Sequence, residues 1–134
     1  MNVGLIGLGK MGLLHAGILN SLENVTLCAI SEKENMLLKH IGKVLPHITV
    51  YQNYEEMLNE EQLDLVYITT PMASHLPIMS NCIEKNMNFF VEKPLTRNLE
   101  EAKQVCAELQ NSDIIHGVGS VSYTHLTLPT ILLV

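Results

Sequence analysis

Basic residues are scarce in this sequence. Eight Lys and Arg residues stand against fourteen Asp and Glu residues, which gives a formal net charge of −6 at pH 7 over 134 residues. An acidic protein is repelled by polyanions, because binding to phosphate-rich surfaces depends on clustered Lys and Arg. The charge balance therefore argues against nucleic acid or an anionic membrane as the main partner.

Long apolar runs are also lacking. No stretch approaches the roughly 20 apolar residues of a membrane-spanning helix, and the N-terminus has no basic region followed by a long hydrophobic segment. The three cysteines have no CxxC spacing, and the histidines have no metal-ligand spacing. We therefore expect a cytoplasmic protein with no metal site, in which Cys28, Cys82 and Cys106 are buried, reduced thiols.

The sequence does contain a glycine-rich motif at its start. The apolar run 3–6 leads into Gly7, Gly9 and Gly12, and an apolar stretch with helical character follows. In such a strand–turn–helix unit Gly7 allows the tight turn, Gly9 lets the backbone approach a pyrophosphate, and Gly12 lets the helix pack on the strand. The phosphates would lie at the helix N-terminus, near the backbone N–H groups of Lys10 and Met11.

The rest of the chain alternates between short apolar runs and amphipathic segments. This pattern predicts strands at 3–6, 25–30, 47–51, 63–70, 88–91 and 113–119, and helices at 11–22, 34–45, 54–59, 73–86 and 98–111. The last helix would begin at an N-cap, Asn98, and bury Leu99, Val105 and Cys106. The alternation predicts an α/β fold with a doubly wound, mainly parallel sheet in the order 3-2-1-4-5-6.

The end of the second predicted strand bears on the choice of cofactor. A carboxylate about twenty residues past the glycine motif accepts hydrogen bonds from the adenosine ribose and repels a 2′-phosphate. We place Ser31 at this tip, followed by Glu32 and Lys33. A serine at this tip would not repel a 2′-phosphate, and Lys33 offers a cation nearby. These two residues weakly favour NADP. Glu32 is the ribose acid instead if the strand ends one residue later, so NAD stays open.

Three segments together resemble the Gfo/Idh/MocA oxidoreductases, the family of glucose–fructose oxidoreductase and inositol dehydrogenase. They are GLIGLGKMGLLHAG at 4–17, ITTPMASH at 68–75 and VEKPL at 91–95. The resemblance implies that Lys93 is the catalytic lysine, that Glu92 orients it, and that the bond before Pro94 is often cis. An ammonium at the carboxyl end of a strand can also stabilise a developing alkoxide. Without the other segments, Glu92 and Lys93 would read as a solvated charge pair.

The resemblance also implies the remaining cofactor contacts. Thr69, Thr70 and Pro71 would line the cofactor between adenosine and nicotinamide. His75 has two interpretations, direct cofactor contact or a structural role at the start of a helix. We interpret His15 as a packing or supporting residue.

The family resemblance implies a further α/β domain that follows this one and is absent from the sequence. That domain would supply a general-base histidine, most of the substrate pocket and the usual homo-oligomer interface. The complete enzyme would transfer hydride between NAD(P) and a sugar, cyclitol or related polyol, and this chain would be inactive alone. The alternative is a stand-alone dinucleotide-binding module that senses redox state without catalysis.

Residues 121–134, VSYTHLTLPTILLV, differ from the rest. They carry no Asp, Glu, Lys or Arg and contribute no element to the predicted fold. One reverse translation, GTC TCT TAT ACA CAT CTG ACG CTG CCG ACG, is similar to the adapter of transposase-based sequencing libraries. We therefore expect 1–120 to be the NAD(P)-binding domain and 121–134 to be a translated adapter. A native apolar β tail is the alternative, which its Thr, Tyr, Leu and Val content permits.

Overall fold

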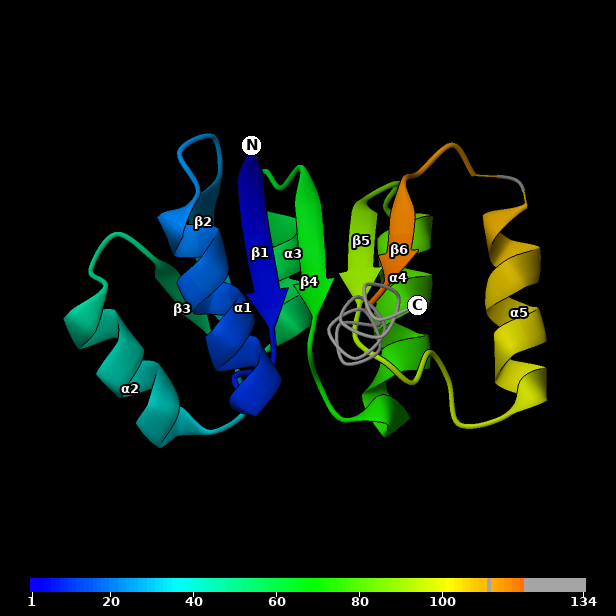
Figure 1. Cartoon of the computed structure of the whole chain (residues 1–134), viewed down its shortest axis with the longest axis horizontal. Helices are drawn as coiled ribbons and strands as arrows, with labels where there is room; N and C mark the ends of the chain where they lie inside the picture. The colour runs from blue at the N-terminus through cyan, green and yellow to red at the C-terminus, as the bar shows by residue number, and fades with distance from the viewer. Residues whose placement is uncertain (111, 120–134) are drawn as a thin grey trace, which may run out of the picture.

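A computed structural model describes residues 1–110 and 112–119, which form one parallel sheet flanked by helices on both faces (Figure 1). The strands are β1 (Asn2–Ile6), β2 (Thr26–Ser31), β3 (Thr49–Tyr51), β4 (Leu65–Ile68), β5 (Asn88–Val91) and β6 (His116–Val118). Their order is β3-β2-β1-β4-β5-β6, and every neighbouring pair is parallel. The predicted α/β class and strand order are confirmed.

The helices divide between the two faces of this sheet. They are α1 (Lys10–Ser21), α2 (Asn35–Val44), α3 (Tyr54–Glu60), the 3₁₀ turn η1 (Met72–Ser74), α4 (His75–Glu84) and α5 (Leu99–Leu109). One apolar cluster joins Leu19 of α1 and Ile41 of α2 to β1 and β2. The other joins Met57 of α3, Met79 of α4 and Val105 of α5 to β4 and β5. Because the sheet is covered on both faces, its strands are largely apolar.

Parallel strands bring their carboxyl ends to one edge of the sheet, where the connecting loops gather (Figure 1). The loop after β1 leads into α1, the loop after β4 leads into η1, and the turn after β5 carries Glu92 and Lys93. Ligands of doubly wound sheets bind at this edge. None of the helices described is long and apolar enough to cross a membrane.

Some predictions about individual residues are wrong. Cys106 is exposed and Cys28 only half-buried, whereas Cys82 is buried. Leu99 is 67% exposed. The buried positions of α5 are Glu101 and Val105. The buried face of this helix is therefore narrower than the one that the spacing of its apolar residues predicted. The predicted tail 121–134 lies outside the described residues.

Candidate functional site

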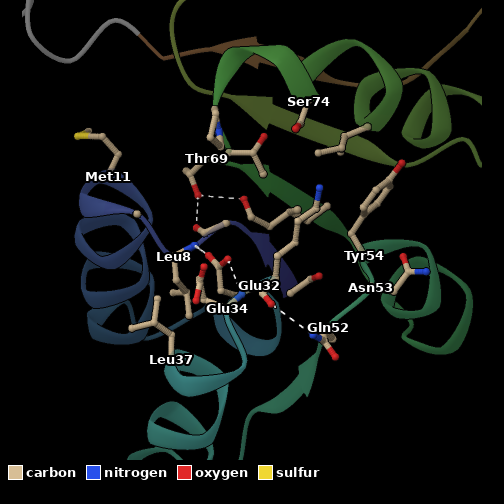
Figure 2. A pocket seen from close by; sticks show the side chains of 18 of the residues that line it. Leu8, Met11, Glu32, Glu34, Leu37, Gln52, Asn53, Tyr54, Thr69 and Ser74 are labelled. Carbon is tan, nitrogen blue, oxygen red and sulfur yellow. Dashed lines mark hydrogen bonds between the residues drawn. The ribbon is translucent and has the colours of Figure 1, made fainter.

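A cavity of about 940 Å³ opens at the carboxyl edge of the sheet (Figure 2). Its wall comes from the loop after β1, the end of β2, the start of α3, the loop after β4 and the start of α4. Most of the predicted cofactor residues lie in it: Gly7, Gly9, Lys10, Met11, Ser31, Glu32, Lys33, Thr69, Thr70 and Pro71. The wall also contains residues that sequence reasoning missed, namely Leu37, Gln52, Asn53 and Tyr54.

The glycine turn has the geometry that a phosphate site needs. Gly7 has φ +96°, a left-handed conformation that side chains disfavour, and a Cβ on Gly12 would lie 2.0 Å from the carbonyl oxygen of Gly7. A Cβ on Gly9 would meet nothing within 4 Å. Gly9 is the N-cap of α1, and because glycine has no side chain, no N-cap side chain bonds to the first N–H groups of the helix. Gly9, Lys10 and Met11 line the cavity, and the first N–H groups of a helix have no intrahelical partner, so this helix start fits an anionic pyrophosphate.

Glu32 is attached to this turn. Its Oε2 accepts a hydrogen bond from Leu8 N–H at 2.6 Å and its Oε1 accepts one from Glu34 N–H at 3.1 Å (Figure 2). Ser31 is the last residue of β2 and is only 3% exposed. The backbone N–H of Glu32 still bonds to Tyr51 O, so the ladder with β3 continues one residue further. Glu32 rather than Ser31 therefore presents its side-chain oxygens beside the glycine turn.

The two threonines after β4 have different roles. Thr69 is 7% exposed, and its hydroxyl donates to the carbonyl oxygens of Gly7 at 2.7 Å and Ile6 at 3.1 Å. Thr69 thus fixes the glycine turn and has no free proton for a ligand. The Thr70 hydroxyl is buried and has no hydrogen-bond partner among the residues that the structure describes. A buried polar group without a partner is costly, and a ligand in the cavity would relieve that cost.

His75 supports the wall and does not line it. It is 1% exposed. Its Nε2 lies 2.9 Å from Thr70 O, and its Nδ1 lies 3.0 Å from Pro94 O and 3.2 Å from Leu95 O. The ring therefore links the loop after β4 to the turn after β5. This arrangement supports the structural interpretation of His75 over direct cofactor contact.

The turn after β5 holds the predicted catalytic lysine outside the cavity wall. Lys93 is exposed, and the peptide bond between Lys93 and Pro94 is cis, as the family resemblance implied. Glu92 is 6% exposed and pairs with His15, with 2.8 Å between Oε1 and Nε2. The remaining predicted residue, Gly12, also lies outside the wall and acts through packing.

Tyr54 adds a polar group at the far end of the cavity. Its hydroxyl accepts a hydrogen bond from Asn81 Nδ2 at 2.9 Å. Burial and the nearby Glu55 carboxylate raise the pKa of Tyr54 above its usual value, so the phenol stays protonated at neutral pH. In residues 1–110 and 112–119, no group of three or more His, Cys, Asp or Glu side chains could hold a metal ion.

Comparisons with known proteins agree with this geometry. Residues 1–120 match a family described as an oxidoreductase family with an NAD-binding Rossmann fold, Gfo/Idh/MocA. The myo-inositol 2-dehydrogenase of Thermotoga maritima is 28% identical over 119 residues, which cover 89% of this chain and 36% of that protein. The alpha-N-acetylgalactosaminidase of Shewanella oneidensis is 34% identical over 114 residues, covering 78% and 25%.

Solved structures give the same result. The crystal structure of GenD2 from gentamicin A biosynthesis in complex with NAD superimposes with a TM-score of 0.81 at 26% identity. That match covers 89% of this chain and 34% of the GenD2 chain. The chain thus spans between a quarter and about a third of the length of the curated relatives cited above.

Proposed function

Because the chain belongs to the Gfo/Idh/MocA oxidoreductase family, whose NAD-binding domain matches residues 1–120, we propose that it is the cofactor-binding part of a dehydrogenase. The substrate class would be a polyol or sugar, as the name of the inositol dehydrogenase relative suggests. The observation that carries the proposal is the open N-terminus of α1 at Gly9, facing the same cavity as the Glu32 carboxylate.

The cavity suits a dinucleotide in three places. The pyrophosphate would accept hydrogen bonds from the backbone N–H groups of Lys10 and Met11, helped by the positive end of the α1 dipole. The Glu32 carboxylate has about four lone-pair directions and uses two for Leu8 N–H and Glu34 N–H. The remaining lone pairs can accept hydrogen bonds from the two hydroxyls of the adenosine ribose. The Thr70 hydroxyl, without a partner in the described part of the chain, can bond to the ligand.

The same geometry supports a preference for NAD. The weak lean towards NADP depended on Ser31 facing the ribose, but Ser31 is 3% exposed. The neighbouring Glu32 carries a carboxylate into the cavity wall, where it would repel a 2′-phosphate. Lys33 also lies in the wall and is exposed, but a cation one residue away does not remove the repulsion.

The chemistry would take place at the turn after β5. A bound nicotinamide ring supplies the acceptor or donor of hydride. The Lys93 ammonium would hydrogen-bond to the substrate oxygen and stabilise the negative charge that develops as the hydroxyl loses its proton. Residues outside this chain would take that proton and enclose the substrate. The chain alone would therefore bind cofactor without turning over a polyol.

Isothermal titration of the 134-residue chain with NADH and with ADP, which has the adenosine and both phosphates but no nicotinamide ribose, tests this proposal. We expect saturable binding of both, tighter for NADH because Lys93 would contact the nicotinamide ribose. K93A should reduce the difference between the two ligands. His40 is exposed on α2, so H40Q is a control that should bind both normally. Failure of the wild-type chain to bind either ligand would contradict the proposal.

A further inference from the structure

A buried acid–base pair connects the helix of the phosphate site to the turn of the catalytic lysine. His15 lies on α1 and is 8% exposed; Glu92 follows β5 and is 6% exposed. Their side chains meet at 2.8 Å, although 77 positions separate them in sequence. A carboxylate only accepts hydrogen bonds, so His15 Nε2 is the donor. The other carboxylate oxygen, Oε2, accepts the backbone N–H of Lys93 at 3.1 Å.

We propose that His15 is a positioning residue for Lys93. His15 holds the Glu92 carboxylate in one orientation, and that carboxylate holds the backbone N–H of Lys93. The chain of contacts runs from α1, whose N-terminus faces the phosphate site, to the residue proposed to contact the nicotinamide ribose. This inference rests on the proposed function for the role of Lys93, but the contacts themselves do not depend on a cofactor.

Burial explains why the pair should set the geometry of the turn. A buried carboxylate is costly unless donors surround it, and the contacts described give Glu92 two, His15 Nε2 and Lys93 N–H. Removing His15 would leave one. The carboxylate would then rotate towards solvent, which weakens its bond to Lys93 N–H.

The surroundings of His15 restrict its movement. Its ring lies 5.4 Å from the Tyr67 ring and 5.5 Å from the Phe90 ring, centroid to centroid. These two aromatic rings come from β4 and β5 and are 4.8 Å apart. On the other side of the turn, His75 Nδ1 contacts Pro94 O and Leu95 O. The Lys93 turn is thus held on one side through His15 and on the other through His75.

A merely structural role for His15, such as anchoring α1, predicts a different pattern of effects from a positioning role. Loss of α1 packing would disturb the glycine turn and weaken the binding of every ligand that carries the two phosphates. Loss of positioning would affect only the part of the ligand near Lys93. ADP has the adenosine and both phosphates but neither the distal ribose nor the nicotinamide, so comparing it with NADH separates these cases.

The experiment compares H15L with H15Q in the 134-residue chain. Leucine fills the site without a donor, whereas the glutamine amide N–H can replace His15 Nε2. We expect H15L to lose about ten-fold in NADH affinity, the effect of one hydrogen bond to a charged group, with ADP affinity unchanged. H15Q should restore most of the loss, and H15L should have little further effect in a K93A background.

Amide hydrogen exchange gives a readout that needs no cofactor. Without ligand, the Lys93 amide should exchange about ten-fold faster in H15L than in the wild type, while the amides of α1 keep their protection. If H15L does not fold, as judged by circular dichroism, H15N replaces it, because asparagine is too short to reach Glu92. Equal loss of NADH and ADP affinity, or unchanged Lys93 exchange, would overturn the role of His15. Binding of neither ligand by the wild-type chain would contradict the proposed function, while the exchange measurement would still test His15.

Discussion

The glycines of the motif and of α1 have different structural roles. A Cβ on Gly12 would lie 2.0 Å from the carbonyl oxygen of Gly7, which is backbone and cannot move aside cheaply. Gly9 and Gly17 both have open space where a Cβ would stand. Gly9 begins α1 beside the cavity, whereas Gly17 is an exposed position inside α1. Substitutions at Gly12, Gly9 and Gly17 therefore test packing, ligand access and helix propensity separately.

Alanine substitutions should resolve these roles. G12A should lower the free energy of unfolding by about 3 kcal/mol or more, because the side chain overlaps backbone. G17A should raise it by up to about 1 kcal/mol, since alanine is a better helix former than glycine. G9A should leave stability nearly unchanged but weaken NADH binding by obstructing the pyrophosphate. Urea unfolding and NADH titration measure both quantities. A stable G12A variant would show that the turn can relax.

Glu32 should determine cofactor choice. E32Q is nearly isosteric and keeps an oxygen for Leu8 N–H, but it removes the charge that repels a 2′-phosphate. We expect NADH affinity to fall about ten-fold and the preference for NADH over NADPH to fall with it. Competitive titration with both reduced cofactors measures the ratio. Glu23 is exposed and absent from the cavity wall, so E23Q is the control. An unchanged ratio in E32Q would show that Glu32 does not face the ribose.

Among the helices and strands, α5 has the clearest local interactions that fix where it begins. Asn98 is its N-cap, and Asn98 Oδ1 accepts the N–H of Glu101 at 3.0 Å. Glu101 in turn accepts the backbone N–H of Arg97 at 3.0 Å and its Nε–H at 2.7 Å. These bonds, the guanidinium bond first, hold the pKa of Glu101 below its usual value. The carboxylate is therefore ionised at neutral pH, and its contribution is lost as the pH falls through that lowered pKa.

Removing the cap of α5 should destabilise the domain measurably. We expect N98A to lower the free energy of unfolding by about 1 kcal/mol, the usual cost of losing an N-cap. N98S is the matched control, since serine also accepts a hydrogen bond from the first turn and should retain most of the stability. Thermal and urea unfolding of the three chains would show the difference. Equal stability of N98A and N98S would mean that the Arg97–Glu101 contact alone fixes the start of α5.

The same elements show how far sequence reasoning reached. The period of the apolar residues was sufficient to predict every strand and the order of the sheet, because both depend on local pattern and simple connection rules. It overextended β4, predicted as 63–70 but observed as Leu65–Ile68, although the backbone N–H of Thr69 still donates to Ile6 O just beyond the strand. It also misplaced Cys106, since exposure depends on which neighbours cover a helix face.

The site shows a similar division. Gly7 and Gly9 lie in one strand–turn–helix unit, so their spacing alone pointed to the cavity, whereas spacing left both Ser31 and Glu32 open as the ribose-facing residue. The contact between His15 and Glu92 joins residues 77 positions apart, and the sequence carries no local signal for it. Gln52, Asn53 and Tyr54 reach the cavity only because β3 pairs with β2. Long-range contacts of this kind follow from the assembled sheet rather than from any one segment.

At the scale of the whole molecule, the family match ends before the chain does. The match covers residues 1–120, which include all six strands of the described sheet. The family relatives are considerably longer, with this chain spanning 36% of the inositol dehydrogenase. We propose that 121–134 is not part of the domain and that the dehydrogenase continues in the native gene beyond the codon for Gly119.

A deletion variant and the native gene test this proposal separately. Removal of 121–134 should leave the unfolding midpoint and the NADH affinity unchanged, because the six strands and the residues described in the cavity wall and in both apolar clusters all lie before position 120. Amplification of the locus from source DNA should then reveal an in-frame continuation of about 200 residues, the size of an ordinary second domain. Native DNA that encodes VSYTHLTLPT after Ser120 would contradict the adapter interpretation. It would also favour the stand-alone dinucleotide-binding module, in which K93A should bind NADH and ADP as the wild-type chain does.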